Sequence, residues 1–218
     1  MLDDLVYRWR SAGKPPEPSI AWPRARWLAA FPQYGDLLRS LPSQLDRTAH
    51  RAVCAEAVVD AKSAERALVA VMAWGQGNNG YAQIRTSDVV STPRAADRLL
   101  SVARTLAAEG AVAACRRLGD DHDCRLYRLG PAFGTKYLYF CQPVGQEITA
   151  LIHDRLVSDW LLEHAALALI SEGWSERRSA YSRQMRAWAA DLGCAADDVE
   201  LCIFREMATD RDSQWSTP

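Results

Sequence analysis

The stretch of sequence that decides the fold reads Gly130-Pro131-Ala132-Phe133-Gly134-Thr135-Lys136. Its small and cyclic residues permit a very tight hairpin between two helices. A hairpin of this kind points successive backbone N–H groups outward, and such groups form an anion site that suits the phosphate of a nucleic acid. Lys136 then falls in the first turn of the following helix, where the helix dipole and partial burial disfavour its ammonium form. An amine that is neutral part of the time is a nucleophile, so the stretch predicts a reactive lysine beside an anion site.

The segments around this stretch predict an all-α chain. Residues 124–142 are ambiguous, because their aromatic-rich pattern fits either a β-hairpin or two short helices around a tight turn. Six prolines within the first 45 residues predict irregular coil around short helical pieces. Elsewhere apolar residues recur at helical spacing. We expect helices from about Thr48 to Trp74, stopped by Gly75; from Pro93 to Gly110; from Ala111 to Leu118; from Leu156 to near Gly173; from Tyr181 to Gly193; and from Asp197 to Met207, followed by a frayed tail.

Composition describes an ordinary globular chain. Its 218 residues are 49% hydrophobic and 24% charged, which is enough to bury a real core. The 26 basic and 27 acidic residues give a net charge of −1, which does not indicate a polyanionic partner. Only three of the basic residues are lysines: Lys14, Lys62 and Lys136. A lysine that falls within a functional motif is therefore a candidate functional residue.

The termini and the cysteines indicate a cytoplasmic protein without metal. The first residues carry acids and no long apolar run, so they do not resemble a secretory signal, and no apolar run approaches the roughly 18 residues of a membrane span. The six cysteines form no C-x-x-C motif, which predicts buried thiols with no metal site, iron–sulfur cluster or other cofactor. We expect a monomer that does not contact a membrane.

The stretch at 130–136 resembles the hairpin of the helix-hairpin-helix DNA glycosylases, whose usual form is Leu-Pro-Gly-hydrophobic-Gly-Thr-Lys. Gly130 replaces the Leu and Ala132 the first Gly. In that superfamily a lysine at the last position marks the bifunctional enzymes, which attack the sugar C1′ covalently, and an aspartate follows a loop containing Gly and Pro. Asp154, 18 residues after Lys136, is similar in position. The resemblance therefore implies that Lys136 is the nucleophile and that Asp154 assists it.

Two further segments resemble the 8-oxoguanine DNA glycosylase branch. The loop of residues 77–84 is similar to its Asn-rich loop, in which an asparagine fills the hole left by the damaged base; the resemblance gives this role to Asn78, with Asn79 beside it. Gln83 stands where the family has an arginine that reads the opposite cytosine. Near the C-terminus, Glu200 replaces a glutamine that reads the purine edge, and its two oxygens can accept from purine N–H donors.

The same resemblance implies a pocket for a flipped base. Phe204, four residues after Glu200, matches a phenylalanine that stacks on the purine, and Phe140 falls on the other face of the base. The two rings would sandwich a nucleobase, with stacking of about 1–3 kcal/mol. The first 50 residues leave no room for the family's N-terminal β-rich domain, so we do not expect that domain in them. Arg155 and Leu156 stand where the family has a histidine after the catalytic aspartate.

The resemblance also implies a two-lobed helix-hairpin-helix glycosylase fold with the active site in the cleft between the lobes. Residues 1–50 and 155–218 would form one helical lobe. Residues 51–154 would form the other, which ends in the helix-hairpin-helix at about 124–142 and the Gly/Pro–Asp loop.

Simpler structural roles compete with these assignments. Asp154 could cap the helix that starts near Arg155. Asn78 and Asn79 suit a turn. Glu200 could belong to a capping box with Asp197. Phe140, Phe204 and Trp74 could be core aromatics, and His153 could be structural. Three arginines that flank the hairpin could hold phosphates or form a solvated face: Arg125, Arg128 and Arg155.

Three functions fit these patterns. The first is a bifunctional DNA glycosylase and AP lyase that flips a modified purine, 8-oxoguanine in the first place, out of double-stranded DNA for base excision repair. The second keeps the fold and the chemistry but acts on another modified base, for example in phage defence. The third is a helix-hairpin-helix protein that binds DNA without catalysis.

Overall fold

The structure, a computed structural model, describes residues 1–17, 19–76, 80–121, 123–167 and 173–215. In these residues the regular structure is helical apart from two strands of two residues each, β1 (Ile20–Ala21) and β2 (Gln44–Leu45), which pair antiparallel. The predicted all-α class is confirmed.

The larger group of helices lies between residues 24 and 140 and encloses one apolar core. The core residues come from segments that run from Trp22 to Ile152. The helices of this group are α2 (Arg24–Ala30), α3 (Gly35–Ser40), α4 (Arg47–Cys54), α5 (Ala61–Gln76), α6 (Ala82–Val90), α7 (Ala95–Glu109), α8 (Ala111–Cys115) with its π-helical continuation η3 (Arg116–Asp120), and α9 (Pro131–Phe140); two short 3-10 turns, η1 (Pro32–Tyr34) and η2 (Ala55–Val58), join them.

The smaller group joins the two ends of the chain. A second apolar core collects side chains such as Trp9, Trp160 and Met185 from helices far apart in sequence. These helices are α1 (Leu2–Ser11), α10 (Arg155–Ala165), α11 (Trp174–Leu192) and α12 (Ala196–Trp215).

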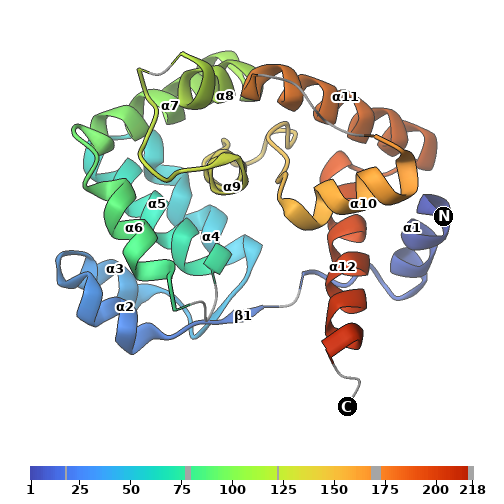
Figure 1. The fold of residues 1–218 in the computed structure, drawn as a ribbon, viewed down its shortest axis with the longest axis horizontal. Coiled ribbons are helices and arrows are strands. Elements are labelled where there is room, and N and C mark those ends of the chain that lie inside the picture. Colours follow the sequence, from blue (N-terminus) through green and yellow to red (C-terminus); the bar gives the residue numbers. More distant parts are fainter. Residues whose placement is uncertain (18, 77–79, 122, 168–172, 216–218) are drawn as a thin grey trace.

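Helix α9 lies where the two groups meet. Figure 1 shows it almost end-on in the middle of the molecule, with α4, α5 and α6 to one side and α10 and α12 to the other. It packs against α4, α5 and α8, and residues 134–140 are all buried. A helix in this position can carry a functional side chain to the junction of the two groups.

Two glycines, one in η3 and one in α9, allow the start of α11 to approach both elements closely. A Cβ at Gly119 would lie 2.2 Å from the ring of Trp174, and one at Gly134 would lie 2.9 Å from the same ring. No side chain fits at those separations, so Trp174 can pack over both backbones only because the two positions are glycine.

Several predicted helix ends need correction. Gly75 does not stop α5, which continues to Gln76, and Pro93 precedes α7, whose first residue is Ala95. Helix α10 ends at Ala165, where Ala166 takes a positive φ of 49°, and not near Gly173. The predicted frayed tail is wrong through Trp215, because α12 continues to that residue. Gly110 and Gly193, with φ of 87° and 61°, end α7 and α11 as predicted.

Neither alternative for residues 124–142 matches the structure. Residues 124–129 form turns, and a single helix, α9, begins directly after Gly130. The helix before the turns is α8 with its π-helical continuation, which ends at Asp120. The sequence pattern failed here because Pro131 opens a helix as its first residue and does not lie in the turn.

The packing differs from the predicted division of the chain. Of the first 50 residues only α1 joins the second core, whereas side chains from Trp22 to Leu45 pack in the first core with the central helices. The N-terminal boundary of the smaller group therefore lies near residue 20 in packing terms. The two lobes and the cleft between them stay a prediction.

All six cysteines are free thiols, and five of them are buried, as predicted. Within the described ranges, no helix is both long and apolar enough to cross a membrane.

Candidate active site

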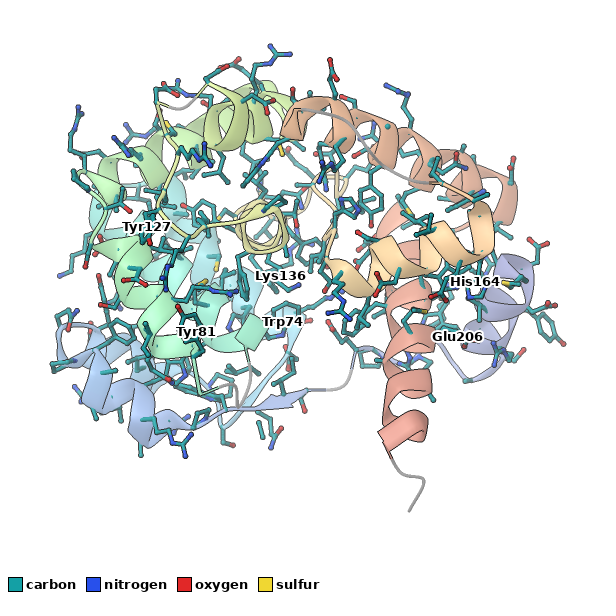
Figure 2. The ribbon with its side chains drawn as sticks, viewed as in Figure 1. Trp74, Tyr81, Tyr127, Lys136, His164 and Glu206 are labelled. Atoms are coloured by element: carbon teal, nitrogen blue, oxygen red, sulfur yellow. The ribbon has the colours of Figure 1, made fainter. Side chains whose placement is uncertain are left out.

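Lys136 is the sixth residue of α9, one turn further from the helix start than predicted. Only 7% of its surface is exposed, whereas Lys14 and Lys62 are exposed. Its ammonium lies 5.8 Å from the ring centre of Trp74 and 5.9 Å from that of Phe133. Figure 2 shows Lys136 and Trp74 close together near the middle of the molecule. The burial sets Lys136 apart from the other two lysines.

Gly75 of α5 makes room for the stem of Lys136. A Cβ at this position would lie 2.8 Å from Cε1 of Phe133 and 3.1 Å from Cδ of Lys136. Gly75 was predicted to end the helix, but it lies within α5, next to the side chain of Lys136.

Lys136 and Asp154 form a buried ion pair. The Nζ atom lies 2.8 Å from Oδ2 of Asp154, and the two side chains are 8% and 14% exposed. The other carboxylate oxygen, Oδ1, accepts the backbone N–H groups of Leu156 at 3.1 Å and Val157 at 3.3 Å, so Asp154 also caps α10. The capping role and the lysine-pairing role, which competed in the sequence, are both present.

The environment keeps Asp154 ionised. Burial alone would raise the pKa of its carboxyl, but the charge and the hydrogen bond of Lys136, together with the N–H of Val157, hold that pKa below its usual value. The positive end of α10 acts in the same direction.

The segment that leads to Asp154 is fixed from two helices. From α11, the buried Arg178 donates to the carbonyls of Leu151 and, at 3.0 Å, Thr149, while the Tyr181 hydroxyl donates to the Ile152 carbonyl at 2.7 Å. These bonds to backbone carbonyls hold the segment immediately before Asp154.

Thr135 of α9 and Gln142, which follows α9, hold the same segment from the other side. Thr135 Oγ1 accepts the N–H of His153 at 3.1 Å. The amide of Gln142 bonds to the backbone of Thr149 and Ala150 at 2.6–3.0 Å. Asp154 therefore has a defined position relative to Lys136.

His153 has the structural role that was the simpler expectation. Its ring stacks on Tyr181 at 4.5 Å, and its Nε2 lies 3.0 Å from Oγ of Ser158. Burial, followed by the charges of Arg178 and Arg177, lowers the pKa of His153 to about 4. The imidazole is therefore neutral at ordinary pH and packs beside the ion pair.

Glu200 is fully buried in a second ion pair. Arg47, at the start of α4, donates from Nη1 at 2.8 Å and from Nη2 at 3.1 Å, which occupies both oxygens of Glu200. Burial raises the pKa of Glu200 to about 7, against the opposing effect of Arg47. Because Glu200 is 0% exposed, a purine edge does not reach these oxygens in this conformation.

The capping box proposed for Glu200 is not formed. Helix α12 begins at Ala196, and the N–H of Ala195 bonds to the carboxylate of Asp198 at 3.1 Å, so the capping pair lies two residues before the predicted pair of Asp197 and Glu200. Glu200 therefore lies beyond the residues that cap the helix.

The two predicted stacking rings are core aromatics here. Phe140 is completely buried, and its ring contacts those of His50, Trp74 and Tyr139 at 5.4, 4.9 and 5.1 Å between centres. Phe204 is half-buried against the second core. In this conformation Phe140 has no face open to a nucleobase, so the structure does not support the predicted sandwich.

Of the predicted opposite-base residues, only Gln83 can be placed. Asn78 and Asn79 lie outside the described residues. Gln83 is half-buried in α6, next to the exposed Tyr81 and Ile84.

An aromatic–arginine cluster borders this part of α6, and among its members the sequence pointed only to Arg128. Arg128 donates to the Tyr81 hydroxyl, pairs with Asp88 at 2.9 Å and lies over the ring of Tyr127 at 5.3 Å. Arg85 lies over the ring of Tyr81 at 5.7 Å. Figure 2 shows Tyr81 and Tyr127 on the same side of Lys136. The interleaving of Tyr and Arg in residues 81–85 and 125–128 was the available signal.

The predicted anion-binding stretch forms the start of α9. Pro131 is exposed, and the helix has no side-chain cap, so the amides of Ala132 and Phe133 are the donors that a helix start leaves outside its own hydrogen bonds. The stretch occupies these positions: Gly130 precedes the helix, and Pro131, Ala132, Phe133, Gly134 and Thr135 form its first residues.

Comparison with family profiles matches residues 13–204 to the family described as "Putative 8-oxoguanine DNA glycosylase OGG-like protein". Comparisons with curated proteins and with solved structures gave no match. The matched span contains the Lys136–Asp154 pair and both partners of the Arg47–Glu200 pair. Because it covers most of the chain, the chain belongs to this OGG-like family of DNA glycosylases.

Proposed function

We propose that the protein is a bifunctional DNA glycosylase and AP lyase that removes a modified purine, 8-oxoguanine in the first place, from double-stranded DNA. The observation that carries the proposal is the 2.8 Å contact between Lys136 and Asp154 in a buried position. A phosphate clamp alone does not need such a pair, which argues against a protein that only binds DNA.

The chemistry assigns one step to each partner. Asp154 takes up a proton from Lys136 and passes it to solvent, which restores the carboxylate and leaves a free amine that attacks C1′ of the flipped nucleotide. The C1′–N bond breaks, and its electron pair leaves with the base, which takes up a proton. The negative charge of Asp154 stabilises the positive charge that develops on the sugar. Opening of the sugar gives a Schiff base on Lys136; loss of a C2′ proton then breaks the C3′–O bond and nicks the strand.

Local features supply DNA contacts despite a net charge of −1. The open amides of Ala132 and Phe133 suit a phosphate. The exposed rings of Tyr81 and Tyr127, with Arg128 between them, suit stacking on bases next to an extruded nucleotide. Such contacts position the duplex without a basic overall charge, and we expect a monomer to be sufficient.

Borohydride trapping tests the proposal. Wild-type protein incubated with an 8-oxoguanine duplex and sodium borohydride should form a covalent adduct, and Lys136→Gln should form none. Lys62→Gln, which changes an exposed lysine, is the matched control and should trap like the wild type. An equal adduct yield from Lys136→Gln would reject the nucleophile; binding without base release from any duplex would favour the binding-only alternative.

A second candidate keeps this chemistry but changes the base. It is favoured by the occupation of both Glu200 oxygens by Arg47 and by Gln83 in place of the family's arginine. A panel of duplexes with oxidised, alkylated and phage-type modified bases separates the two candidates. Release of a non-oxidised modified base alone would favour the second, and a role outside oxidative repair such as phage defence.

A further inference from the structure

A cavity of about 470 Å³ lies between α4, α9, α12 and the segment before β1. This volume falls within the range of about 300–1,000 Å³ that is usual for small-molecule sites. Its wall includes the carboxylates of Glu17, Asp46, Asp197 and Asp198, together with Arg47 and Tyr139.

One wall residue has an acceptor without a donor. Glu17 is 7% exposed, and its Oε2 accepts from Nε of Arg47 at 2.5 Å. Its other oxygen, Oε1, is buried and has no hydrogen-bond partner. A buried carboxylate oxygen left in this way is costly unless a ligand supplies a donor.

Arg47 connects this oxygen to Glu200. The guanidinium binds both oxygens of Glu200 on one side and Oε2 of Glu17 on the other, and it lies 4.9 Å over the ring of Tyr139. Glu200 therefore fixes Arg47, and Arg47 fixes Glu17 at the cavity. The carboxylate that lines the cavity with a free oxygen is Glu17, and Glu200 lies behind it.

The cavity lies within reach of the nucleophile. Tyr139 follows Lys136 by three residues on α9, which places the two about 4.5 Å apart along the helix axis and on neighbouring faces. A base whose C1′ stands at Lys136 can therefore extend toward Tyr139.

We infer that this cavity receives the flipped base and that Glu17 is the residue that reads it, by accepting a hydrogen bond at Oε1 from the 2-amino group of the base. The inference rests on the proposed glycosylase function and deepens it. The wall carries four carboxylates, and its arginine, Arg47, is already paired with Glu17 and Glu200. Such a wall disfavours a ligand that presents only anionic or carbonyl groups. The cavity favours a base edge with amino or ring N–H donors, such as 8-oxoguanine, and Arg47 and Glu200 are positioning residues.

Two duplexes separate base reading from the lysine chemistry. One carries 8-oxoguanine and the other an abasic site, which has no base to read but still reacts with Lys136. Glu17→Gln should lower the single-turnover rate of 8-oxoguanine release by about 10- to 100-fold, the range for loss of a hydrogen bond to a charged group. Its borohydride trapping on abasic DNA should equal that of the wild type. Glu56→Gln, away from this cavity, should change neither rate.

A third duplex tests the inference without any variant. It carries 8-oxohypoxanthine, which lacks the 2-amino donors of 8-oxoguanine, and the wild type should release it at least about 10-fold more slowly. Equal release of the two bases, or normal 8-oxoguanine release by Glu17→Gln, would overturn the inference. So would abasic trapping by the wild type without any release of 8-oxoguanine. Failure of the wild type to trap abasic DNA would instead reject the proposed function.

Discussion

Two of the buried ion pairs among the described residues, Lys136–Asp154 and Arg47–Glu200, differ in how their carboxylates are supported. Asp154 is 14% exposed and accepts two backbone N–H groups at the start of α10, and its pKa lies below the usual value. Glu200 is wholly buried and is held by Arg47, which it shares with Glu17; burial raises its pKa to about 7.

The difference shows that a cation is not enough to keep a buried carboxylate ionised. For Glu200, the rise in pKa caused by burial exceeds the lowering caused by its bidentate arginine. For Asp154, the backbone donors at the start of α10 act together with Lys136, and the pKa is lowered. The pair that we propose to perform the chemistry is thus the one whose carboxyl has a lowered pKa and keeps some solvent access. The other pair supports the neighbouring cavity.

Asp154→Asn should have the largest effect, and it should fall on activity. The amide oxygen can still accept from the α10 N–H groups, so the protein should fold, but Lys136 loses its proton acceptor and its countercharge. We expect base release to fall by about 10²- to 10⁴-fold in single-turnover assays. A rate within threefold of the wild type would show that the ion pair is only structural.

Arg47→Met should have the largest effect on stability. It leaves Glu200 and Glu17 without a cation in the interior, and breaking a buried pair in this way costs about 3–5 kcal/mol. Lys136→Met should cost less, because Asp154 keeps its two backbone donors. Urea unfolding of both variants measures the difference, and equal losses would contradict the contrast between the pairs.

The pH dependence of stability should have opposite signs for the two carboxyl groups. The pKa of Glu200 rises from the ordinary glutamate value of 4.5 to about 7 on folding. Between these two values the folded state holds more protons on Glu200 than the unfolded state, so its contribution to stability falls as pH rises, by about 3 kcal/mol in all. Asp154, with a lowered pKa, contributes stability that is lost as pH falls through its folded value. The free energy of unfolding, measured between pH 4.5 and 7.5, should depend less on pH in Glu200→Gln than in the wild type. An unchanged pH dependence would reject the raised pKa of Glu200.

Gly75→Ala should have the smallest effect of the series. The new methyl group meets Phe133 and the stem of Lys136 and should displace the amine slightly. We expect trapping about 3- to 10-fold slower, because small misplacements of a reacting group lower its rate. Gly35→Ala in α3, where a Cβ meets only the end of the flexible Arg39 side chain at 3.0 Å, is the matched control and should trap normally.

Short-range signals in the sequence predicted correctly that Lys136 and Asp154 come together. The spacing of 18 residues between Lys136 and Asp154 suffices because one helix and one loop join them, and the cap at α10 forms within three residues of Asp154. The ends of α7 and α11 were predicted for the same reason, since Gly110 and Gly193 adopt positive φ whatever packs around them.

Long-range contacts decided the rest. The partners of Arg47 lie 30 residues before it and 153 residues after it, and no local pattern connects Glu17, Arg47 and Glu200. Gly75 suggested a helix end, but burial against Phe133 and Lys136 keeps it in α5. Phe140 matched a stacking position, yet its ring completes the first core with Trp74 and His50. These outcomes depend on tertiary packing, which overrides local patterns.

Mapping the trapped adduct tests the central claim most directly. The chain has three lysines and one terminal amine, so proteolysis and mass spectrometry of the borohydride-reduced complex can assign the modified nitrogen without ambiguity. The account predicts that the reduced sugar fragment lies on Lys136, the one lysine that is buried and paired with a carboxylate. An adduct on Lys14, Lys62 or the terminal amine would contradict it.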